Sequence, residues 1–258
     1  GRLFGGIGEE GNGQRNYQSF FTELGLNLGP VEVLAAGRFD NYSDFGSTVN
    51  PKLSMRYSPF SFLMLRASGG TGFRAPSLDE LYSNSSYAYP WFQDLTACQN
   101  TQNDFYCSEQ QYRVFSGGNS DLKEETSISF NFGTVIQPTK RLSISADYWE
   151  TKIENAVGLD LNDLMFAETK LGNESLKKQG VNIIRNNGFI DQIIAPNLNL
   201  ARQETRGLEF AAGYNMRLGA LLIRPQFDHS HLLTSREEVF PGLGYRNKLG
   251  EAGRPEWR

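Results

Sequence analysis

The chain has 258 residues, a formal net charge of −4 and a sequence pI near 5.4, so it lacks the basic footprint of a nucleic-acid-binding protein. Its mean hydropathy is −0.45, and no apolar run approaches the ~18 residues of a membrane helix, which excludes helical spans. A transmembrane β-barrel stays possible, because its strands alternate lipid-facing and lumen-facing residues and give only a weak hydropathy signal.

Short and long connections alternate along the chain. The short ones fall at 28–30, 58–60, 137–141 and 217–219, and the longer ones fall near 43–48, 75–120, 155–200 and 234–253. Up-and-down strands with tight turns at one end and long loops at the other are typical of a transmembrane β-barrel. In such a barrel the turns are periplasmic and the loops are extracellular. The pattern therefore predicts an all-β, antiparallel membrane protein.

The segments beside the short turns alternate apolar and polar residues, as Ile128, Phe130 and Phe132 do with their neighbours. Successive side chains of a strand point to opposite faces, so one face suits lipid and the other suits a wet lumen. A soluble β-sandwich shows the same alternation, but the strand lengths and the regular connections favour the barrel. We expect strands at about 17–28, 31–42, 49–58, 61–74, 121–136, 141–155, 201–216 and 220–234, with a ninth beginning near 255–258.

The alternation also predicts which side chains line the lumen and which face the membrane. The expected lumen set is Glu23, Asn27, Arg38, Asp40, Lys52, Arg56, Arg66, Ser129, Asn131, Asp147, Gln226 and Asp228. Aromatic residues near the strand ends or on the outer face would form a girdle at the membrane surface. They are Phe20, Phe39, Tyr57, Phe60, Phe73, Tyr148, Trp149, Tyr214 and Phe227.

The first long loop, 75–120, carries two local signals. Ser77 followed by Glu80 is a capping-box pattern that can start a helical turn. Cys98 and Cys107 both fall in this loop, with no third Cys or nearby His. Such a pair predicts a disulfide formed in the oxidising periplasm rather than a metal site, with two free thiols as the alternative.

Aromatic residues gather between 83 and 115, which we expect at the outer mouth. Rings with a polar tip recur at recognition surfaces, although they also pack loops. We predict that this segment helps to capture a ligand through Tyr87, Tyr89, Trp91, Phe92, Tyr106, Tyr112 and Arg113. In the second long loop, residues 160–184 are expected to hold a helical turn or two, without an assigned function.

Two clusters look chemical but are not expected to act. His229 and His231 lie beside Asp228 and Ser230, but alternate residues of a strand face opposite sides. We therefore expect no catalytic residue and no enzyme activity. The cluster at 40–44 lacks the glycine and glutamate spacing of a calcium loop, so we expect no metal site and no cofactor.

Six stretches together resemble the barrel of TonB-dependent outer-membrane receptors. They are 37–52, 65–68, 72–82 (with Phe73-Arg74-Ala75-Pro76), 118–127, 147–156 and 204–209. In the fourth stretch, Ser120 and Glu124 stand where the family usually has prolines, which affects only the local loop conformation. The likeness covers most of 17–258 in the family's order.

The resemblance implies a bacterial outer-membrane location and an amino-terminal plug with a TonB box inside a barrel of 22 strands. The chain begins with Gly1-Arg2, without Met, and stops as a strand begins, so we expect both ends to be cut. Residues 1–258 would then be a partial barrel of about eight strands with loops at about 75–120, 155–200 and 234–253. We expect an open, curved sheet whose first and last strands lack partners.

The family implies an energy-coupled importer of a scarce, bulky nutrient: a ferric siderophore, haem, cobalamin or an oligosaccharide. Its expected partners are the TonB complex, through the plug and TonB box, the lipid of the outer membrane and a small-molecule ligand. A passive, porin-like channel is the alternative. The plug and its TonB box would distinguish these two functions.

Overall fold

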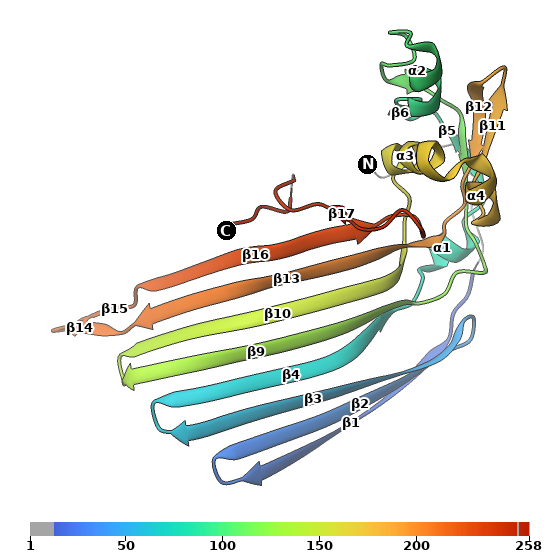
Figure 1. Cartoon of the computed structure of the whole chain (residues 1–258). Helices are drawn as coiled ribbons and strands as arrows, with labels where there is room; N and C mark the ends of the chain where they lie inside the picture. The colour runs from blue at the N-terminus through green and yellow to red at the C-terminus, as the bar shows by residue number, and fades with distance from the viewer. Residues whose placement is uncertain (1–12, 252, 258) are drawn as a thin grey trace.

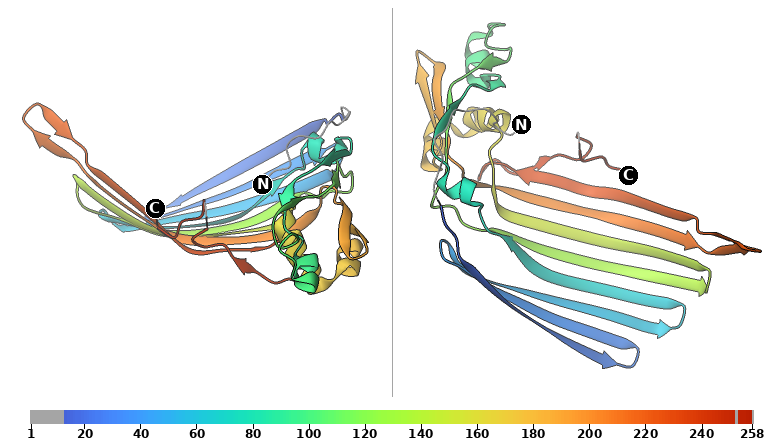
Figure 2. Two further views of the ribbon diagram at one scale, coloured as in Figure 1. Left: turned by 90° about the horizontal axis from the view of Figure 1, so that it is seen from above. Right: turned by 180° about the vertical axis from the view of Figure 1, so that it is seen from behind.

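A computed structural model describes residues 13–251 and 253–257 of the chain. Among these residues, nine strands form one antiparallel sheet in the order β1-β2-β3-β4-β9-β10-β13-β16-β17. The sheet is open and curved, with β1 at one edge and β17 at the other (Figures 1 and 2), as expected for a partial barrel. Its strands are β1 Tyr17–Leu28, β2 Val31–Tyr42, β3 Gly46–Phe60, β4 Leu63–Arg74, β9 Glu125–Thr139, β10 Leu142–Val157, β13 Asn199–Tyr214, β16 Gln226–Glu238 and β17 Arg246–Asn247.

The cross-strand register gives the sheet a polar face and an apolar face. Asp40 lies opposite Ser19 on one side and Thr48 on the other, whereas Phe39 lies between Phe20 and Val49. Since directly opposed residues share a face, the same ladders carry the polar row from β1 to β16. The residues expected in the lumen all lie on this polar face: Glu23, Asn27, Arg38, Asp40, Lys52, Arg56, Arg66, Ser129, Asn131, Asp147, Gln226 and Asp228.

The boundaries of the first strands follow the sequence prediction closely, but the connection after β2 differs. β1 and β2 have the expected bounds, but the long connection expected at 43–48 is a tight turn. Tyr42 pairs directly with Gly46, and the ladder continues without a break from there. Gly46 has a φ of +103°, which only glycine adopts without strain, so this residue permits the tight reversal.

The strand expected at 220–234 also differs. A short ribbon of β14 Met216–Leu218 and β15 Leu221–Ile223 extends beyond the sheet, and β16 begins after it. The ninth strand of the sheet, β17, lies inside the loop expected at 234–253, and at the expected position near 255–258 the described residues show only an isolated bridge between Trp257 and His231. Arg258 of the expected strand, and residues 1–12 of the expected domain, lie outside the described residues.

The long connections fold together into a cap at one end of the sheet (Figure 1). We define the cap as residues 75–124, 158–198 and 239–245. A four-stranded sheet, in the order β11-β12-β8-β5, runs through its two main segments. The cap elements are α1 Leu78–Tyr82, β5 Ser86–Ala88, β6 Trp91–Phe92, α2 Leu95–Thr101, β7 Gln110–Gln111, β8 Val114–Ser116, α3 Leu161–Leu171, α4 Asn173–Lys178, β11 Asn182–Asn186 and β12 Phe189–Ile194.

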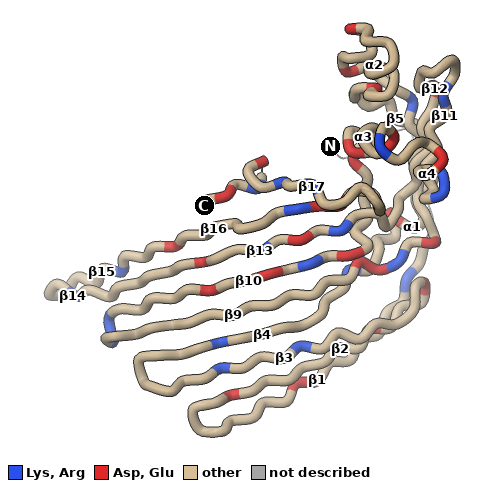
Figure 3. Tube along the Cα trace, viewed as in Figure 1, with Lys and Arg blue, Asp and Glu red and all other residues tan. Residues whose placement is uncertain are grey.

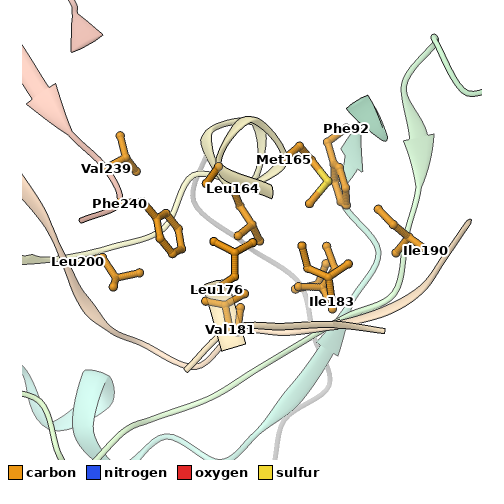
Figure 4. Packing of buried hydrophobic residues seen from close by; sticks show 14 residues of the cluster. Phe92, Leu164, Met165, Leu176, Val181, Ile183, Ile190, Leu200, Val239 and Phe240 are labelled. Carbon is orange, nitrogen blue, oxygen red and sulfur yellow. The ribbon is translucent and has the colours of Figure 1, made fainter. Parts of the chain in front are cut away.

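The hydrophobic core lies in the cap rather than against the sheet (Figure 4). Leu164 and Met165 of α3 pack with Leu176 of α4, Ile183 of β11 and Phe240, and all five are at most 1% exposed. The helical turns expected within 160–184 are thus present as α3 and α4. Burying these side chains is the main free-energy gain available to the cap, at roughly 1.5–3 kcal/mol for each large apolar side chain.

The apolar face of the sheet carries most of the expected girdle, but Trp149 does not belong to it. Trp149 lies opposite Asn131 on the polar face, and a Cβ added at Gly207 would come within 3.1 Å of its ring. The Trp149 ring therefore packs over the backbone of Gly207, on the polar face of the sheet. Among the described residues, no helix is long and apolar enough to cross a bilayer.

Candidate functional site

Three of the aromatic residues predicted to bind ligand are exposed on the cap. Tyr87 is 45%, Tyr89 59% and Trp91 62% exposed. β6 consists of Trp91 and Phe92, and because neighbouring strand residues point oppositely, Trp91 faces solvent while Phe92 enters the core. The cap thus presents large rings on a backbone that its own core holds in place.

Arg113 joins this surface. Its guanidinium carbon lies 5.6 Å from the centre of the Tyr87 ring, and a guanidinium nitrogen lies 3.6 Å from a carboxylate oxygen of Asp191. Phe115 of β8, which pairs directly with Tyr87, also contacts the Tyr87 ring in a tilted arrangement with ring centres 4.9 Å apart. Arg113 and Asp191 are both about half exposed, so their ion pair adds little to the stability of the fold. Its effect is to hold Arg113 beside the Tyr87 ring.

Phe92 and Tyr112 differ from the exposed rings, because the structure buries Phe92 in the cap and packs the partly buried Tyr112 against the same core. Phe92 is 1% exposed, and its ring centre lies 4.8 Å from that of Tyr112. Burial raises the pKa of the Tyr112 hydroxyl above its usual value. Phe92 belongs to the cap core and Tyr112 packs against it, so these two rings lie beneath the exposed surface that carries Tyr87, Tyr89 and Trp91.

A disulfide between Cys98 and Cys107 closes the tip of the cap. Asp94 caps the amino end of α2 by accepting a hydrogen bond from the Ala97 amide at 3.0 Å. Within the closed segment, the Tyr106 ring stacks on Phe189 of β12 with ring centres 4.3 Å apart. Tyr106, the remaining residue of the predicted ligand-binding set, therefore attaches the tip of the cap to the second long loop.

A buried ion cluster fastens the two long loops together, and the sequence analysis missed it. Arg185 donates two hydrogen bonds to Asp94, both at 2.9 Å, and two to Glu168, at 2.8 and 2.5 Å. Thr96 donates to Glu168 at 2.9 Å. Burial disfavours the charged guanidinium, but the carboxylate hydrogen bonds outweigh it and raise the pKa of Arg185. Asp94 lies 91 residues from Arg185, so no local pattern could reveal the pair.

A second ion cluster lies at the rim, where the strands enter the cap. Arg74 donates to Glu125 at 2.7 and 2.6 Å and to Glu80 at 3.1 Å. The expected capping box is present, since the Glu80 amide donates to Ser77 and the Ser77 amide donates to Glu80. Burial raises the pKa of Glu80, but the hydrogen bonds from Arg74 and Ser77 outweigh it, so that pKa lies below its usual value.

The polar face of the sheet holds cross-strand ion pairs and a hollow of about 500 Å³. Arg66 reaches Asp147 through two hydrogen bonds of 2.8 and 2.7 Å, and Arg56 pairs with Glu32. The hollow is lined by Asn27, Glu32, Ser54, Arg56, Arg66, Ser68 and Asn131 together with Leu34, which lies on the same face, and neighbouring residues of the same strands. A surface of mixed charge and amide groups suits water or polar protein rather than lipid.

The histidines occupy the positions that the strand pattern predicts. His229 and His231 share a face with Phe210, whereas Asp228 and Ser230 lie on the polar face, so these groups cannot act together. Trp257 stacks on His231, with ring centres 3.6 Å apart. Among the described residues, no group of three or more His, Cys, Asp or Glu side chains is arranged to hold a metal ion.

The geometry so far is that of a barrel wall with a folded cap. The family model of the TonB-dependent receptor-like β-barrel matches residues 3–245. The chain belongs to the TonB-dependent receptor family. It is therefore a bacterial outer-membrane β-barrel protein, of a family of receptors and transporters. A comparison with curated proteins finds no match.

Solved structures share the fold at low sequence identity. The siderophore receptor PirA from Acinetobacter baumannii matches 86% of the chain with a TM-score of 0.59 and 17% identity. The ferric enterobactin receptor PfeA from Pseudomonas aeruginosa, in complex with enterobactin, matches 85% with a TM-score of 0.59 and 16% identity. The peptide importer RagAB matches 88% with a TM-score of 0.50 and 14% identity. The chain spans only 29%, 27% and 23% of these three structures.

Proposed function

We propose that the chain supplies barrel wall and ligand-binding loops to a receptor that imports a scarce, bulky nutrient with energy from a TonB complex. The observation that supports this most is the cap, whose two long segments share one buried core and one ion cluster. A binding surface benefits from such support, because side chains held on rigid elements lose less freedom when a ligand binds.

The nutrient belongs to the class of ferric siderophores, haem, cobalamin or oligosaccharides. The fold serves unlike ligands, since two of the similar structures are siderophore receptors and a third is a peptide importer. We place recognition on the exposed rings of Tyr87, Tyr89 and Trp91 with Arg113 beside them. We assign the chain no catalytic role.

We place the cap outside the cell and the tight turns in the periplasm. Family barrels carry long loops on the outer side and short turns on the inner side, and here the long connections after β4, β10 and β16 all leave the same end of the sheet, whose opposite end has only short connections (Figure 1). The tight turn between β2 and β3 lies at the cap end and is the exception. A plug and its TonB box would lie against the polar face, where the ion pairs and the hollow are.

A passive channel is the second candidate. The lining of mixed charge on the polar face would also suit a water-filled pore. Energy coupling distinguishes the two, because a passive channel would transport at the same rate whether or not the TonB complex is active. Uptake by cells with and without that complex decides between them.

The ligand surface is tested by changing Trp91 and Tyr89 to Ala in the receptor that contains this chain. We expect both changes to weaken binding and slow uptake, by about tenfold together, because each ring offers a large contact area at low entropic cost. Uptake and surface expression are measured in whole cells, with the family's nutrient classes supplied in turn.

The matched control is Tyr214→Ala, which removes an aromatic ring that is 39% exposed at the other end of the sheet. It should leave affinity and rate unchanged. Normal uptake by the Trp91 and Tyr89 variants, at normal surface expression, would remove the cap rings from the proposed site.

A further inference from the structure

One of the short connections opposite the cap is drawn out into a ribbon. β1 and β2, β3 and β4, and β9 and β10 are each joined by two residues, the last pair being Lys140 and Arg141. Between β13 and β16 the chain continues from 215 to 225 and forms the ribbon of β14 and β15. Figures 1 and 2 show that this ribbon projects past the ends of the neighbouring strands. It therefore offers surfaces that the two-residue turns do not have.

The ribbon leaves one side of β14 without a partner strand. Among the described residues β14 pairs only with β15, and the ladder of β10 ends at Leu142 opposite Tyr214, before β14 begins. Where β10 ends, the Asn215 amide donates to the Arg141 carbonyl at 2.8 Å. In an antiparallel pair alternate residues direct their backbone groups away from the partner strand. An extended segment can therefore add to the free side of β14 as a further strand.

The ribbon also has an apolar face. Met216 lies opposite Ile223, and Leu218 lies opposite Leu221, so these four side chains share one side. Leu218 and Leu221 are 57% and 58% exposed. The ribbon begins beyond Tyr214, an aromatic residue at the strand end, where the girdle of a barrel marks the membrane surface. A bilayer that ends at this ring leaves the leucines in water unless a protein segment covers them.

The charged side chains at this end of β9, β10, β13 and β16 all have the same sign. No carboxylate occurs in 137–146 or 210–227, whereas four exposed cations do: Lys140, Arg141, Arg217 and Arg224. Figure 3 shows cations at the turn between β9 and β10 and beside β15. The nearest acidic residues along these strands lie on the polar face of the sheet: Asp147, Glu209 and Asp228. A partner at the ribbon therefore meets a cationic surface, which favours an acidic partner.

We propose that the ribbon binds an acidic, extended segment of a periplasmic protein, which adds to the free side of β14 as a third strand. The backbone of β14 supplies hydrogen bonds, the apolar face receives apolar side chains of the segment, and the four cations attract its carboxylates. Placing this end of the sheet in the periplasm rests on the orientation given under the proposed function.

The test uses the purified receptor that contains this chain, in detergent at low salt. The probe is a short fluorescent peptide in which Glu alternates with Val, because a strand of that pattern presents valines on one side and carboxylates on the other. Fluorescence anisotropy should show saturable binding. Changing Lys140 and Arg217 to Gln should weaken binding about fivefold, since each exposed ion pair contributes modestly. The matched control, Lys177→Gln with Lys178→Gln on α4, loses the same charge in the cap and should bind as the unchanged receptor does.

Two altered probes separate strand addition from simple charge attraction. A peptide with Pro in place of its central Val keeps its charge but cannot complete a strand ladder, so it should bind much more weakly. A peptide with Lys in place of Glu keeps the strand pattern and should not bind. Equal binding of either altered peptide would overturn the proposal, and so would unchanged binding by the folded double variant. If the double variant does not fold, Arg217→Gln alone serves by the same criterion.

A final measurement distinguishes a protein partner from the membrane surface. The receptor is placed in nanodiscs that contain phosphatidylglycerol, and the acidic peptide is titrated again. Binding should persist, because the ribbon projects past the neighbouring strands (Figure 1). Loss of binding in nanodiscs would assign the four cations to lipid headgroups and overturn the proposal. No nutrient and no energy source are present, so a negative result here leaves nutrient import as proposed.

Discussion

At the scale of single residues, one glycine decides how three strands are joined. Gly133 of β9 lies directly between Arg66 of β4 and Asp147 of β10. A Cβ at this position would come within 1.8 Å of Asp147 Oδ1 and 3.1 Å of Arg66 Nε. The missing side chain therefore lets the guanidinium cross the middle strand and form its bidentate pair with the carboxylate.

We predict that Gly133→Ala destabilises the receptor by about 1–3 kcal/mol, because Asp147, which is 7% exposed, would lose its partner. Urea unfolding of the detergent-solubilised receptor measures this. Gly213→Ala is the control, since a Cβ there meets nothing within 4 Å. Equal midpoints for the two variants would show that the ion pair across Gly133 contributes little.

At the scale of elements, the strands and the local features of the cap were predictable, but the contacts between distant parts of the cap were not. Period-2 alternation fixes both a strand and its faces, so β1 and β2 and the polar row follow from the sequence alone. The Ser77 and Glu80 capping box was also visible, because its partners are three residues apart. The Arg185 cluster was not visible, since its contacts join distant loops, and Phe92 looked like a surface ring until packing buried it.

The disulfide tip of the cap is the element most open to a direct test. The structure bonds Cys98, within α2, to Cys107, nine residues further along the chain and next to Tyr106, which contacts Phe189. In the chain-entropy view, closing so short a loop removes roughly 2–4 kcal/mol of unfolded-chain freedom. The bond should therefore order the tip without reshaping the rest of the cap.

We predict that peptide mapping without reduction recovers Cys98 and Cys107 in one cross-linked fragment from exported receptor. Alkylation before digestion protects against exchange during handling. Reduced and re-digested protein serves as the control and should yield two separate peptides. Recovery of both cysteines as alkylated free thiols from correctly exported receptor would contradict the prediction.

At the scale of the whole molecule, the sheet is a curved wall with open edges. Within the described residues, β1 pairs with β2 on one side only, and the opposite edge ends at β17 and the Trp257 bridge. In hydrocarbon each unpaired backbone group costs several kcal/mol, so an open edge is not stable in a bilayer. The wall therefore needs further strands to span a membrane.

We predict that this chain alone does not transport. Closing it into a narrow barrel would crowd Arg38, Lys52, Arg56 and Arg66 into an interior too small to hydrate them. Liposomes that contain only residues 1–258 should show no uptake of any of the nutrient classes. The complete receptor in matched liposomes is the positive control, and its ligand binding shows that the reconstituted protein is folded. Ligand-specific uptake by the chain alone would disprove this.

The composition of the cap core also dictates an order of assembly. Its side chains come from Phe92 and Val114, from the α3 and α4 region, and finally from Val239 and Phe240. Contacts between segments so far apart in the chain form late, because each requires a long loop to close first. We expect the strands from β4 to β16 to be in place before the cap can exclude water. Until then we expect the apolar side chains of its helices to be exposed to water, which makes this stage of assembly the one most open to proteolysis and aggregation.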